Sequence, residues 1–247
     1  MLTKLQVKYI QSLNQKKFRQ LDKVFIAEGP KIINELLACR NVEPVALYAT
    51  GEWWEQNLAL KDAIPFVACH ELQASELNRI SFLTSPHLVL GVFRHPLFSK
   101  DTPYYGAISL LLDGIQDPGN MGTIVRIADW YGIKQVVASL DCADIFNPKV
   151  VQSTMGSIAR VHIIYDDISS FIKKYANIPI YASVLQGEPL PRVGKVIEGF
   201  VLVGNESKGL REELIRSANY RITIPKYGMA ESLNAAVATG IILSHIQ

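Results

Sequence analysis

The sequence predicts an α/β protein of two units, the second of which contains a parallel sheet. Short apolar stretches alternate with helical patterns twice along the chain, and residues 96–106, which hold two prolines and no strand or helix period, separate the two series. In the second series the apolar stretches are nearly continuous, as is typical of strands buried on both faces of a parallel sheet. We therefore assign residues 1–95 to a small first domain, 96–106 to a linker and 107–247 to the second domain.

The first domain is predicted from runs of β-branched, aromatic and small apolar residues, each followed by a helical pattern. The expected order is strand 25–29, helix 30–38, strand 44–50, helix 52–61, strand 64–69, helix 71–80 and strand 87–93. These elements form a small α/β unit of ordinary domain size.

The residues before this series predict one amphipathic helix with a basic outer surface. Apolar residues recur near helical spacing at Leu2, Leu5, Tyr9, Leu13 and Phe18. Against the single acid Asp22 stand six basic residues: Lys4, Lys8, Lys16, Lys17, Arg19 and Lys23. Such a segment can contact phosphates, although a solvated helix face is the commoner origin of a basic cluster.

The second domain continues the alternation with longer apolar strands. They are expected at 107–113, 135–139, 161–165, 178–184, 199–204 and 220–225, most of them followed by a helix. In open parallel sheets, ligands bind in the loops at the carboxyl ends of the strands. The functional residues are therefore expected in those loops.

Composition excludes several classes of protein. The longest apolar runs are far shorter than the roughly 20 residues that span a bilayer, and the N-terminal segment lacks the apolar region of a secretory signal. We expect no membrane association and a cytoplasmic location. The three cysteines, Cys39, Cys69 and Cys142, are far apart and form no C-x-x-C pair, which predicts reduced thiols and no metal site.

Three loops of the second domain share a polar character. Each follows an apolar strand and places asparagine near glycine: a Pro-Gly-Asn turn at 118–120, the stretch 204–209, and the stretch 224–234 before a helix of small residues. One such loop is usually only a turn, with Asn120 or Ser232 capping a helix. Three in the same half of the chain favour a shared site.

The two common phosphate-binding patterns are absent from these loops. The glycines form no G-x-G-x-x-G stretch, and no G-K-[ST] follows them. A dinucleotide-binding fold of Rossmann type and a P-loop are therefore not supported.

The same loops carry a resemblance to a known family. Residues 113–132, 202–210 and 224–243, in this order and spacing, resemble the three signature motifs of the SpoU (TrmH-like) family of RNA 2′-O-ribose methyltransferases of the SPOUT superfamily. Residues 147–163 resemble the connecting helix of that family. The first hundred residues resemble, more weakly, the ribosomal-protein-like substrate-binding domain that precedes the catalytic domain in many members.

The resemblance implies a fold, a cofactor and an assembly. The fold would be an α/β knot (trefoil), S-adenosylmethionine would bind against the knotted loops, and two chains would pair through the knot domain. The cofactor-binding residues it implies are Leu185, Gly204, Asn205, Gly209, Ile224 and Leu233. The catalytic residues it implies are Asn120, Arg126, Glu206, Ser232 and Asn234.

Arg126 admits two roles. The resemblance implies that it assists deprotonation of the ribose 2′-hydroxyl, yet a guanidinium is a poor base. It could instead bind an RNA phosphate with two hydrogen bonds and leave the proton to phosphate or water. Glu206 could orient Arg126 through a charge-assisted hydrogen bond, or it could be only an acid that the first turn of a helix favours.

Four positions depart from the family pattern. Lys226 stands where an apolar residue is common, Ala235–Ala236 replaces a more usual Val-Ser, and Gln152 stands where arginine is frequent. None removes a residue expected in catalysis. The small residues 235–242 would let backbones approach closely, which suits a dimer interface.

The expected activity is S-adenosylmethionine-dependent methylation of a ribose 2′-hydroxyl in RNA, with ribosomal RNA favoured over tRNA because of the additional domain. The alternative of another class is a noncatalytic RNA-binding or ribosome-assembly factor that has kept the fold. RNA is read largely by shape and by unstacked bases, so the sequence does not specify the methylated nucleotide.

Overall fold

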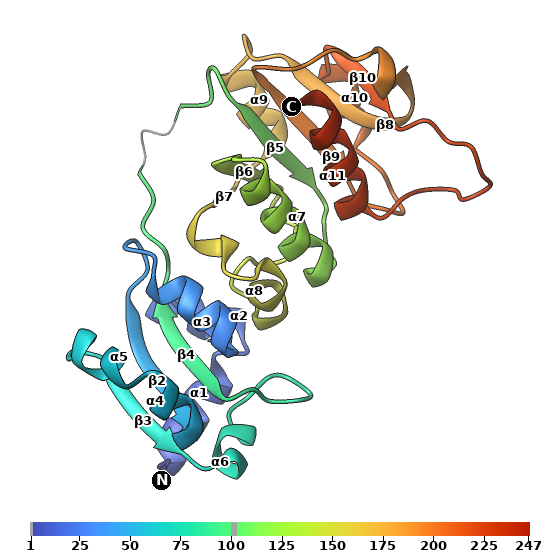
Figure 1. Ribbon diagram of the computed structural model, residues 1–247. Helices are drawn as coiled ribbons and strands as arrows, with labels where there is room; N and C mark the ends of the chain where they lie inside the picture. The colour runs from blue at the N-terminus through green and yellow to red at the C-terminus, as the bar shows by residue number, and fades with distance from the viewer. Residues whose placement is uncertain (1, 100–102) are drawn as a thin grey trace. The chain divides into compact units, whose positions relative to one another are not determined.

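The computed structural model describes residues 2–99 and 103–247. Contacts within the chain divide it into two compact units (Figure 1). The first consists of Met1–Phe98 and Phe146–Ala159, and the second of Ser99–Ile145 and Arg160–Gln247. No helix of the described part is long and apolar enough to cross a membrane.

A mixed four-stranded sheet forms the centre of the first unit. Its strands are β1 (Val24–Glu28), β2 (Pro44–Thr50), β3 (Ala68–Leu72) and β4 (Val89–Arg94), in the order β1-β4-β2-β3. β4 runs antiparallel to both β1 and β2, and β2 pairs with β3 in parallel. The four strands lie at or within four residues of their predicted positions.

Short helices surround this sheet. They are α1 (Lys4–Ser12), α2 (Lys16–Asp22), α3 (Pro30–Leu37), α4 (Gly51–Gln56), α5 (Leu58–Ala63) and α6 (Ala74–Asn78). The single N-terminal helix was a wrong prediction, since the chain breaks between α1 and α2. The break is stabilised by Arg19, whose buried guanidinium Nη1 donates to the carbonyls of Leu13 at 2.8 Å and Asn14 at 2.7 Å.

This contact changes the interpretation of the basic N-terminal segment. Arg19 satisfies carbonyls at the end of α1, so it cannot meet a phosphate. Leu5 and Tyr9 are exposed although they were expected on the apolar face. That face is formed by Leu2 and Leu13, as predicted, together with Ile10.

The segment between the second and third strands of the second domain belongs to the first unit. It carries α8 (Pro148–Thr154) and the 3₁₀ turn η1 (Ser157–Ala159), and α8 packs against β1. The Phe146 ring lies 5.6 Å from that of Phe25 and stacks on His95, and the side-chain amide of Asn41 donates to the Ala159 carbonyl at 2.8 Å. Sequence order alone could not reveal that this segment joins the first unit.

The second unit contains the predicted parallel sheet, which is confirmed with six strands. They are β5 (Ile108–Asp113), β6 (Gln135–Ala138), β7 (His162–Tyr165), β8 (Ile180–Pro189), β9 (Gly199–Gly204) and β10 (Tyr220–Thr223), in the order β10-β8-β9-β5-β6-β7. Every adjacent pair is parallel.

Helices cover both faces of this sheet, as Figure 1 shows. They are α7 (Pro118–Trp130), α9 (Ile168–Lys174), α10 (Glu212–Ser217) and α11 (Ala235–Ile246), with the 3₁₀ turn η2 (Leu190–Arg192). α7 packs with α11, and α9 packs with α10. The central strand β5 is buried along its whole length, which explains its mostly apolar sequence; its two polar residues, Ser109 and Asp113, are buried as well.

Candidate active site

Two of the three polar loops leave neighbouring strands at the same level. β5 and β9 pair in register, with Asp113 opposite Gly204 at their carboxyl ends. The loop that opens α7 and the loop 204–211 therefore begin side by side. The third loop, 224–234, follows the edge strand β10 and leads into α11.

A chain of side-chain hydrogen bonds joins all three loops. The Asn120 side-chain Nδ2 donates to Glu206 Oε1, and the Asn234 Nδ2 donates to Asn120 Oδ1 at 2.7 Å. A carboxylate only accepts, so the Asn120 amide must turn its NH₂ group toward Glu206 and its oxygen toward Asn234. The orientation of one amide is thereby fixed from both sides.

The helix caps come from other residues than the simplest interpretation supposed. Asp117 caps α7 by accepting from the Asn120 backbone N–H at 2.8 Å, which leaves the Asn120 side chain for Glu206. Asn234, rather than Ser232, caps α11: its Oδ1 accepts from the N–H groups of Ala236 at 3.0 Å and Val237 at 3.2 Å. Asn234 therefore starts a helix with its oxygen and holds Asn120 with its nitrogen.

Arg126 and Ser232 lie outside this chain of hydrogen bonds. Arg126 follows Asn120 by six residues on α7, so its side chain leaves the helix about 120° away from that of Asn120. Its side chain is exposed, and it makes no ion pair within the described part of the chain. Ser232 is exposed in the loop two residues before Asn234.

The loop after β9 is shaped by Asn205 and its glycines. The Asn205 Nδ2 donates to the Gly114 carbonyl at 2.9 Å, and its Oδ1 accepts from the N–H groups of Ser207 and Lys208. A Cβ on Gly204 would come within 2.5 Å of the Leu210 nitrogen. Gly209 turns the chain back with a φ of +68°, a conformation that glycine adopts without strain.

Leu185 lies in a bulge of β8. β10 pairs first with Ala182 and then, one residue later, with Glu188, so residues 183–187 loop out of the ladder. The Leu185 carbonyl accepts from the Thr223 hydroxyl at 3.2 Å, which ties this bulge to the end of β10. Because β8 was expected to end at residue 184, the prediction placed Leu185 in a loop, whereas it lies within an irregular strand.

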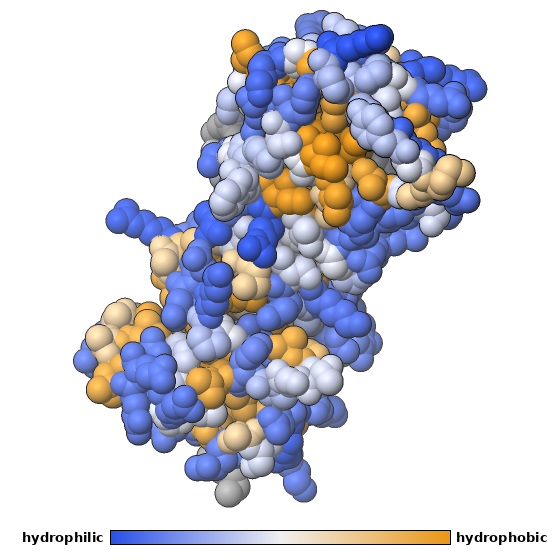
Figure 2. All heavy atoms as spheres, turned by 45° about the vertical axis from the view of Figure 1, so that its right-hand side comes forward, coloured by the Kyte–Doolittle hydropathy of each residue, from blue (hydrophilic) through white to orange (hydrophobic). Residues whose placement is uncertain are grey.

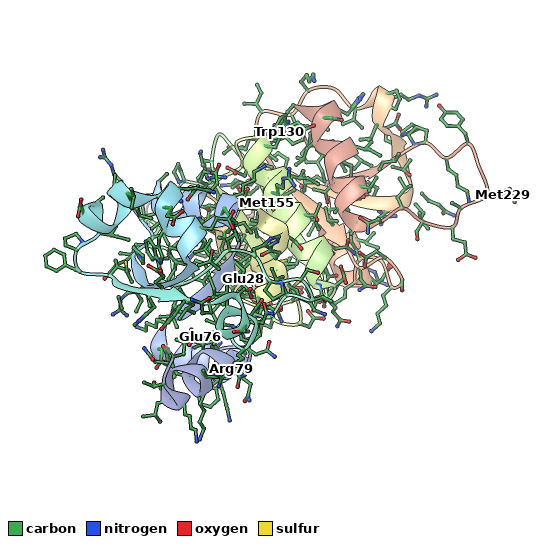
Figure 3. The ribbon with its side chains drawn as sticks, turned by 60° about the horizontal axis from the view of Figure 1, so that its bottom comes forward. Glu28, Glu76, Arg79, Trp130, Met155 and Met229 are labelled. Atoms are coloured by element: carbon green, nitrogen blue, oxygen red, sulfur yellow. The ribbon has the colours of Figure 1, made fainter. Side chains whose placement is uncertain are left out.

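Ile224 and Leu233 flank the third loop. Ile224 is partly buried and Leu233 is exposed, and residues 226–234 between and around them are all exposed. Met229 lies at the tip of this loop (Figure 3). The loop therefore projects backbone and side chains into solvent beside the ends of β8 and β10.

An ion pair at the same sheet edge was missed by sequence reasoning. Asp113, buried at the end of β5, accepts from Arg211 through three nitrogens: the backbone N at 2.8 Å, Nε at 2.7 Å and Nη2 at 2.7 Å. This charge-assisted contact positions the start of α10 and the end of the 204–211 loop. An aspartate at the end of a mostly apolar strand was the available signal.

A second polar cluster lies under the loop that opens α7. The Ser139 hydroxyl accepts from the Gly114 N–H at 2.9 Å and donates to Asp141 at 2.6 Å, and Cys142 accepts from the Ile115 N–H at 3.2 Å. Burial raises the pKa of the Cys142 thiol, so it stays protonated. The cluster supports the backbone at Gly114, where φ is +68°.

Comparison with known proteins assigns the chain to a family. A sequence model described as the SpoU rRNA Methylase family matches residues 107–244, and one described as the MRM3-like substrate binding domain matches residues 4–91. The chain belongs to the SpoU family. All three polar loops fall within the matched range of that family.

Several known proteins are similar to this chain over nearly its whole length. The 23S rRNA (guanosine(2553)-2′-O)-methyltransferase RlmP of Bacillus subtilis is 28% identical over 98% of this chain and 95% of its own. The AdoMet-bound rRNA methyltransferase of Sinorhizobium meliloti superposes with a TM-score of 0.86 at 31% identity, covering 100% of this chain and 95% of that one. A putative RNA methyltransferase of the TrmH family from Porphyromonas gingivalis is 34% identical with a TM-score of 0.82, covering 100% and 98%.

Proposed function

We propose that this SpoU family member transfers a methyl group from S-adenosylmethionine to a ribose 2′-hydroxyl in ribosomal RNA. The observation that carries the proposal is the Glu206–Asn120–Asn234 chain of hydrogen bonds, which brings side chains of three separate loops to one point. The ribosomal substrate is favoured by the rRNA methyltransferases to which the chain is similar over nearly its whole length.

The proposed cofactor fits the loops at this sheet edge. A nucleoside needs backbone N–H and C=O groups at close range, and a Cβ at Gly204 would block the close turn of the 204–211 loop. The residues that would hold S-adenosylmethionine are Leu185, Gly204, Asn205, Gly209, Ile224 and Leu233. When bound, this cofactor supplies an electrophilic methyl group on a sulfonium.

The chain's own residues would orient the ribose. The Asn120 amide is held rigidly between Glu206 and Asn234, so a substrate hydroxyl beside it would meet groups of fixed direction, which lowers the entropic barrier to reaction. Glu206 acts through Asn120 and is a positioning residue. Ser232, exposed beside Asn234, supplies a hydroxyl that can donate to or accept from the RNA.

Arg126 is best suited to bind an RNA phosphate. Its exposed guanidinium has no carboxylate partner within the described part of the chain, because Glu206 accepts from Asn120 instead. A guanidinium donates hydrogen bonds and accepts none, and its planar fork matches two phosphate oxygens. The proton of the 2′-hydroxyl would then pass to phosphate or water.

We also propose a knotted chain and a dimer, both supported by family membership. The dimer would use the face formed by α7 and α11, where Trp130, Val237 and Ile241 expose apolar side chains. Figure 2 shows apolar side chains gathered on a face of the second unit, and Trp130 lies at the end of α7 (Figure 3). A patch of this kind commonly marks an interface.

The small residues of α11 also serve packing within one chain. A Cβ on Gly240 would lie 3.7 Å from Ile127 of α7, so this glycine faces the neighbouring helix. Mixing an Arg126→Ala chain with a cofactor-loop variant such as Gly204→Val, at an RNA concentration well below the KM of the Arg126→Ala protein, tests the composite site: recovered activity in mixed dimers is expected, and none counts against sharing.

The first unit would bind the RNA around the target. The match to a substrate-binding domain over residues 4–91 supports this role, and the exposed lysines of α1 and α2 supply positive charge. We keep residues 1–95, 96–106 and 107–247 as the proposed functional division. The three free cysteines suit the reducing cytoplasm, where we place the protein.

Labelled methyl transfer tests the proposed function. Ribosomal RNA from cells that lack the protein should accept label from S-adenosylmethionine, at a site that mapping of 2′-O-methyl groups identifies. If only tRNA accepts the label, tRNA replaces ribosomal RNA as the proposed substrate. Calorimetric binding of the cofactor without label in any unmodified RNA would reject the enzyme, and absence of cofactor binding would favour a noncatalytic RNA-binding factor.

A further inference from the structure

A cavity of about 440 Å³ lies along the edge strand β10, before the third polar loop begins. Its walls come from β8, β10, the turn η2 and the segment that follows η2. The lining residues are Tyr181, Glu188, Arg192, Val193, Gly194, Lys195, Val196, Asn219, Tyr220, Arg221 and Ile222. This volume lies within the range of about 300–1,000 Å³ that small organic ligands occupy.

Two tyrosines form an aromatic wall of this cavity. The rings of Tyr181 and Tyr220 stack with centroids 4.8 Å apart and planes inclined by 16°. Tyr181 is packed against Gly199 on its other side, where a Cβ would meet the ring at 2.6 Å, so it is held in place. Tyr220 is the outer ring and remains 53% exposed.

The position of Tyr220 is fixed by its neighbour. The Asn219 side-chain oxygen accepts from the Ile180 N–H at 2.8 Å, and the Asn219 N–H donates to the Ile180 carbonyl at 3.0 Å. This pair of contacts ties the start of β10 to β8 and sets Tyr220 beside Tyr181. The outer ring is therefore a preformed platform.

The charges around the platform are mainly positive. Arg192, Lys195 and Arg221 line the cavity against the single acid Glu188. Glu188 forms a long contact with Arg192, 3.7 Å between oxygen and nitrogen, in which the Arg192 side chain remains 76% exposed. A flat aromatic surface among exposed cations matches a nucleotide, whose base stacks and whose phosphate is anionic.

We propose that this cavity binds an unpaired nucleotide of the substrate RNA that lies outside the methylation site. The base stacks on Tyr220, and the phosphate lies among Arg192, Lys195 and Arg221. Ile224, where the proposed cofactor loop begins, directly follows β10 and is four residues after Tyr220, about 13 Å away at roughly 3.3 Å per residue. A few nucleotides of single-stranded RNA span that distance, so the inference rests on the proposed function.

Binding of a single-stranded probe tests the platform. The probe is a fluorescent oligouridine of about 12 nucleotides, with 5-iodouridine for photo-crosslinking. We expect a crosslink to the peptide that contains Tyr220, and about tenfold weaker binding by Tyr220→Ala. Tyr220→Phe should retain binding. The matched control is Tyr105→Ala, because Tyr105 lies on the second unit and is also 53% exposed. The affinity of this control variant for the probe should stay within about twofold of the wild-type value.

A second pair of variants tests the charges without touching the stacked rings. Arg192 and Arg216 each pair with a glutamate four residues away and have side chains 76% and 74% exposed. Log affinity falls linearly as log salt concentration rises, and Arg192→Gln should make this fall less steep. The magnitude of the slope should decrease by about 0.7, the value for one phosphate contact on a single strand. Arg216→Gln should leave the slope unchanged.

Measurements of methyl transfer distinguish a failure of this inference from a failure of the proposed function. With an RNA that is methylated, Tyr220→Ala should raise KM and leave kcat unchanged. If the wild-type protein methylates RNA while both Tyr220→Ala and Arg192→Gln bind and react normally, the cavity proposal is overturned. If the wild-type protein crosslinks through Tyr220 but methylates no RNA, the cavity proposal stands and the proposed function fails.

Discussion

Asn234 Nδ2 donates a hydrogen bond to Asn120 Oδ1 at 2.7 Å, although 114 positions separate the two residues in the sequence. Through this contact the cap of α11 sets the direction of the amide that Glu206 holds from the other side. Stability of the last helix and geometry of the proposed site therefore depend on one side chain.

Asn234→Ala should reduce both properties. Loss of the cap should lower the free energy of unfolding by about 1 kcal/mol, and loss of the Asn120 contact should lower kcat about tenfold to a hundredfold. Asp167→Ala is the matched control, because Asp167 caps α9 by accepting from the Ser170 N–H at 2.8 Å. It should lose similar stability, measured by urea unfolding, with normal methyl transfer. Equal activity loss in both variants would contradict a specific role.

Glu206→Ala should slow methyl transfer about a hundredfold, since the Asn120 amide loses its acceptor. Glu206→Gln should recover part of the rate, because its side-chain oxygen can still accept from Asn120. Calorimetry should give the same cofactor Kd for both variants. Glu212→Ala, an acid on the first turn of α10, serves as control. A Gln variant as slow as the Ala variant would show that the negative charge itself is required.

Arg126→Ala should weaken RNA binding rather than chemistry. We expect KM to rise about tenfold, kcat to change little, and the salt dependence of affinity to fall by one phosphate contact, a slope change of about 0.7 to 0.9. Arg126→Lys should be intermediate, because an ammonium cannot bind two phosphate oxygens in one plane. A large fall in kcat with unchanged KM and salt slope would instead indicate a role in proton transfer.

Asp113→Asn should destabilise the second unit by about 2 kcal/mol, because Arg211 would lose a charged partner that is largely buried. This figure is below that for a fully buried pair, since the Arg211 side chain is 46% exposed. Asp129→Asn should lose less than about 1 kcal/mol, because the Asp129 side chain, which pairs with Arg160, is 22% exposed against 4% for Asp113. Urea unfolding measures both, and equal losses would refute the dependence on burial.

The stability of the first unit should vary with pH through Glu28. Burial raises the pKa of Glu28, whose carboxylate accepts from the Ser81 hydroxyl and the Phe82 N–H. Because the folded pKa is above the unfolded one, this group favours folding below the unfolded pKa, and that contribution is lost as the pH rises through the folded pKa.

Glu28→Gln should therefore flatten this dependence and stabilise the first unit at neutral pH. The glutamine oxygen can accept from the Phe82 N–H, and its NH₂ group can donate to the Ser81 hydroxyl oxygen, without a buried charge. Unfolding can be followed by tryptophan fluorescence, since Trp53 and Trp54 are buried in this unit whereas Trp130 is exposed. An unchanged pH profile would show that the pKa of Glu28 is the same in the folded and unfolded states.

The sequence was most informative where burial is uniform. The runs Ile108–Asp113 and Gly199–Gly204 were predicted within a residue of their observed bounds, because a strand buried on both faces is apolar along most of its length. Long-range contacts were not predictable: Arg19 pairs with carbonyls inside the protein, and α8 packs on β1 rather than with its sequence neighbours.

The candidate site shows the same limit. Its polar residues could be found from their places after apolar strands, but their partners could not. Glu206 was expected beside Arg126 or as a helix acid, and it contacts Asn120. Asp117, which was not singled out, caps α7. Which side chain satisfies which group depends on distances between loops, and these are set only by the folded sheet.

The double use of Asn234 also has a consequence for protein synthesis. A nascent chain that has emerged from the ribosome only as far as β10 contains all six strands of the parallel sheet but not the residue that fixes the Asn120 amide. The proposed catalytic geometry can thus form only after Asn234 and the first turn of α11 have left the exit tunnel. An enzyme proposed to modify ribosomal RNA would accordingly be inactive until this segment has emerged from the ribosome that makes it.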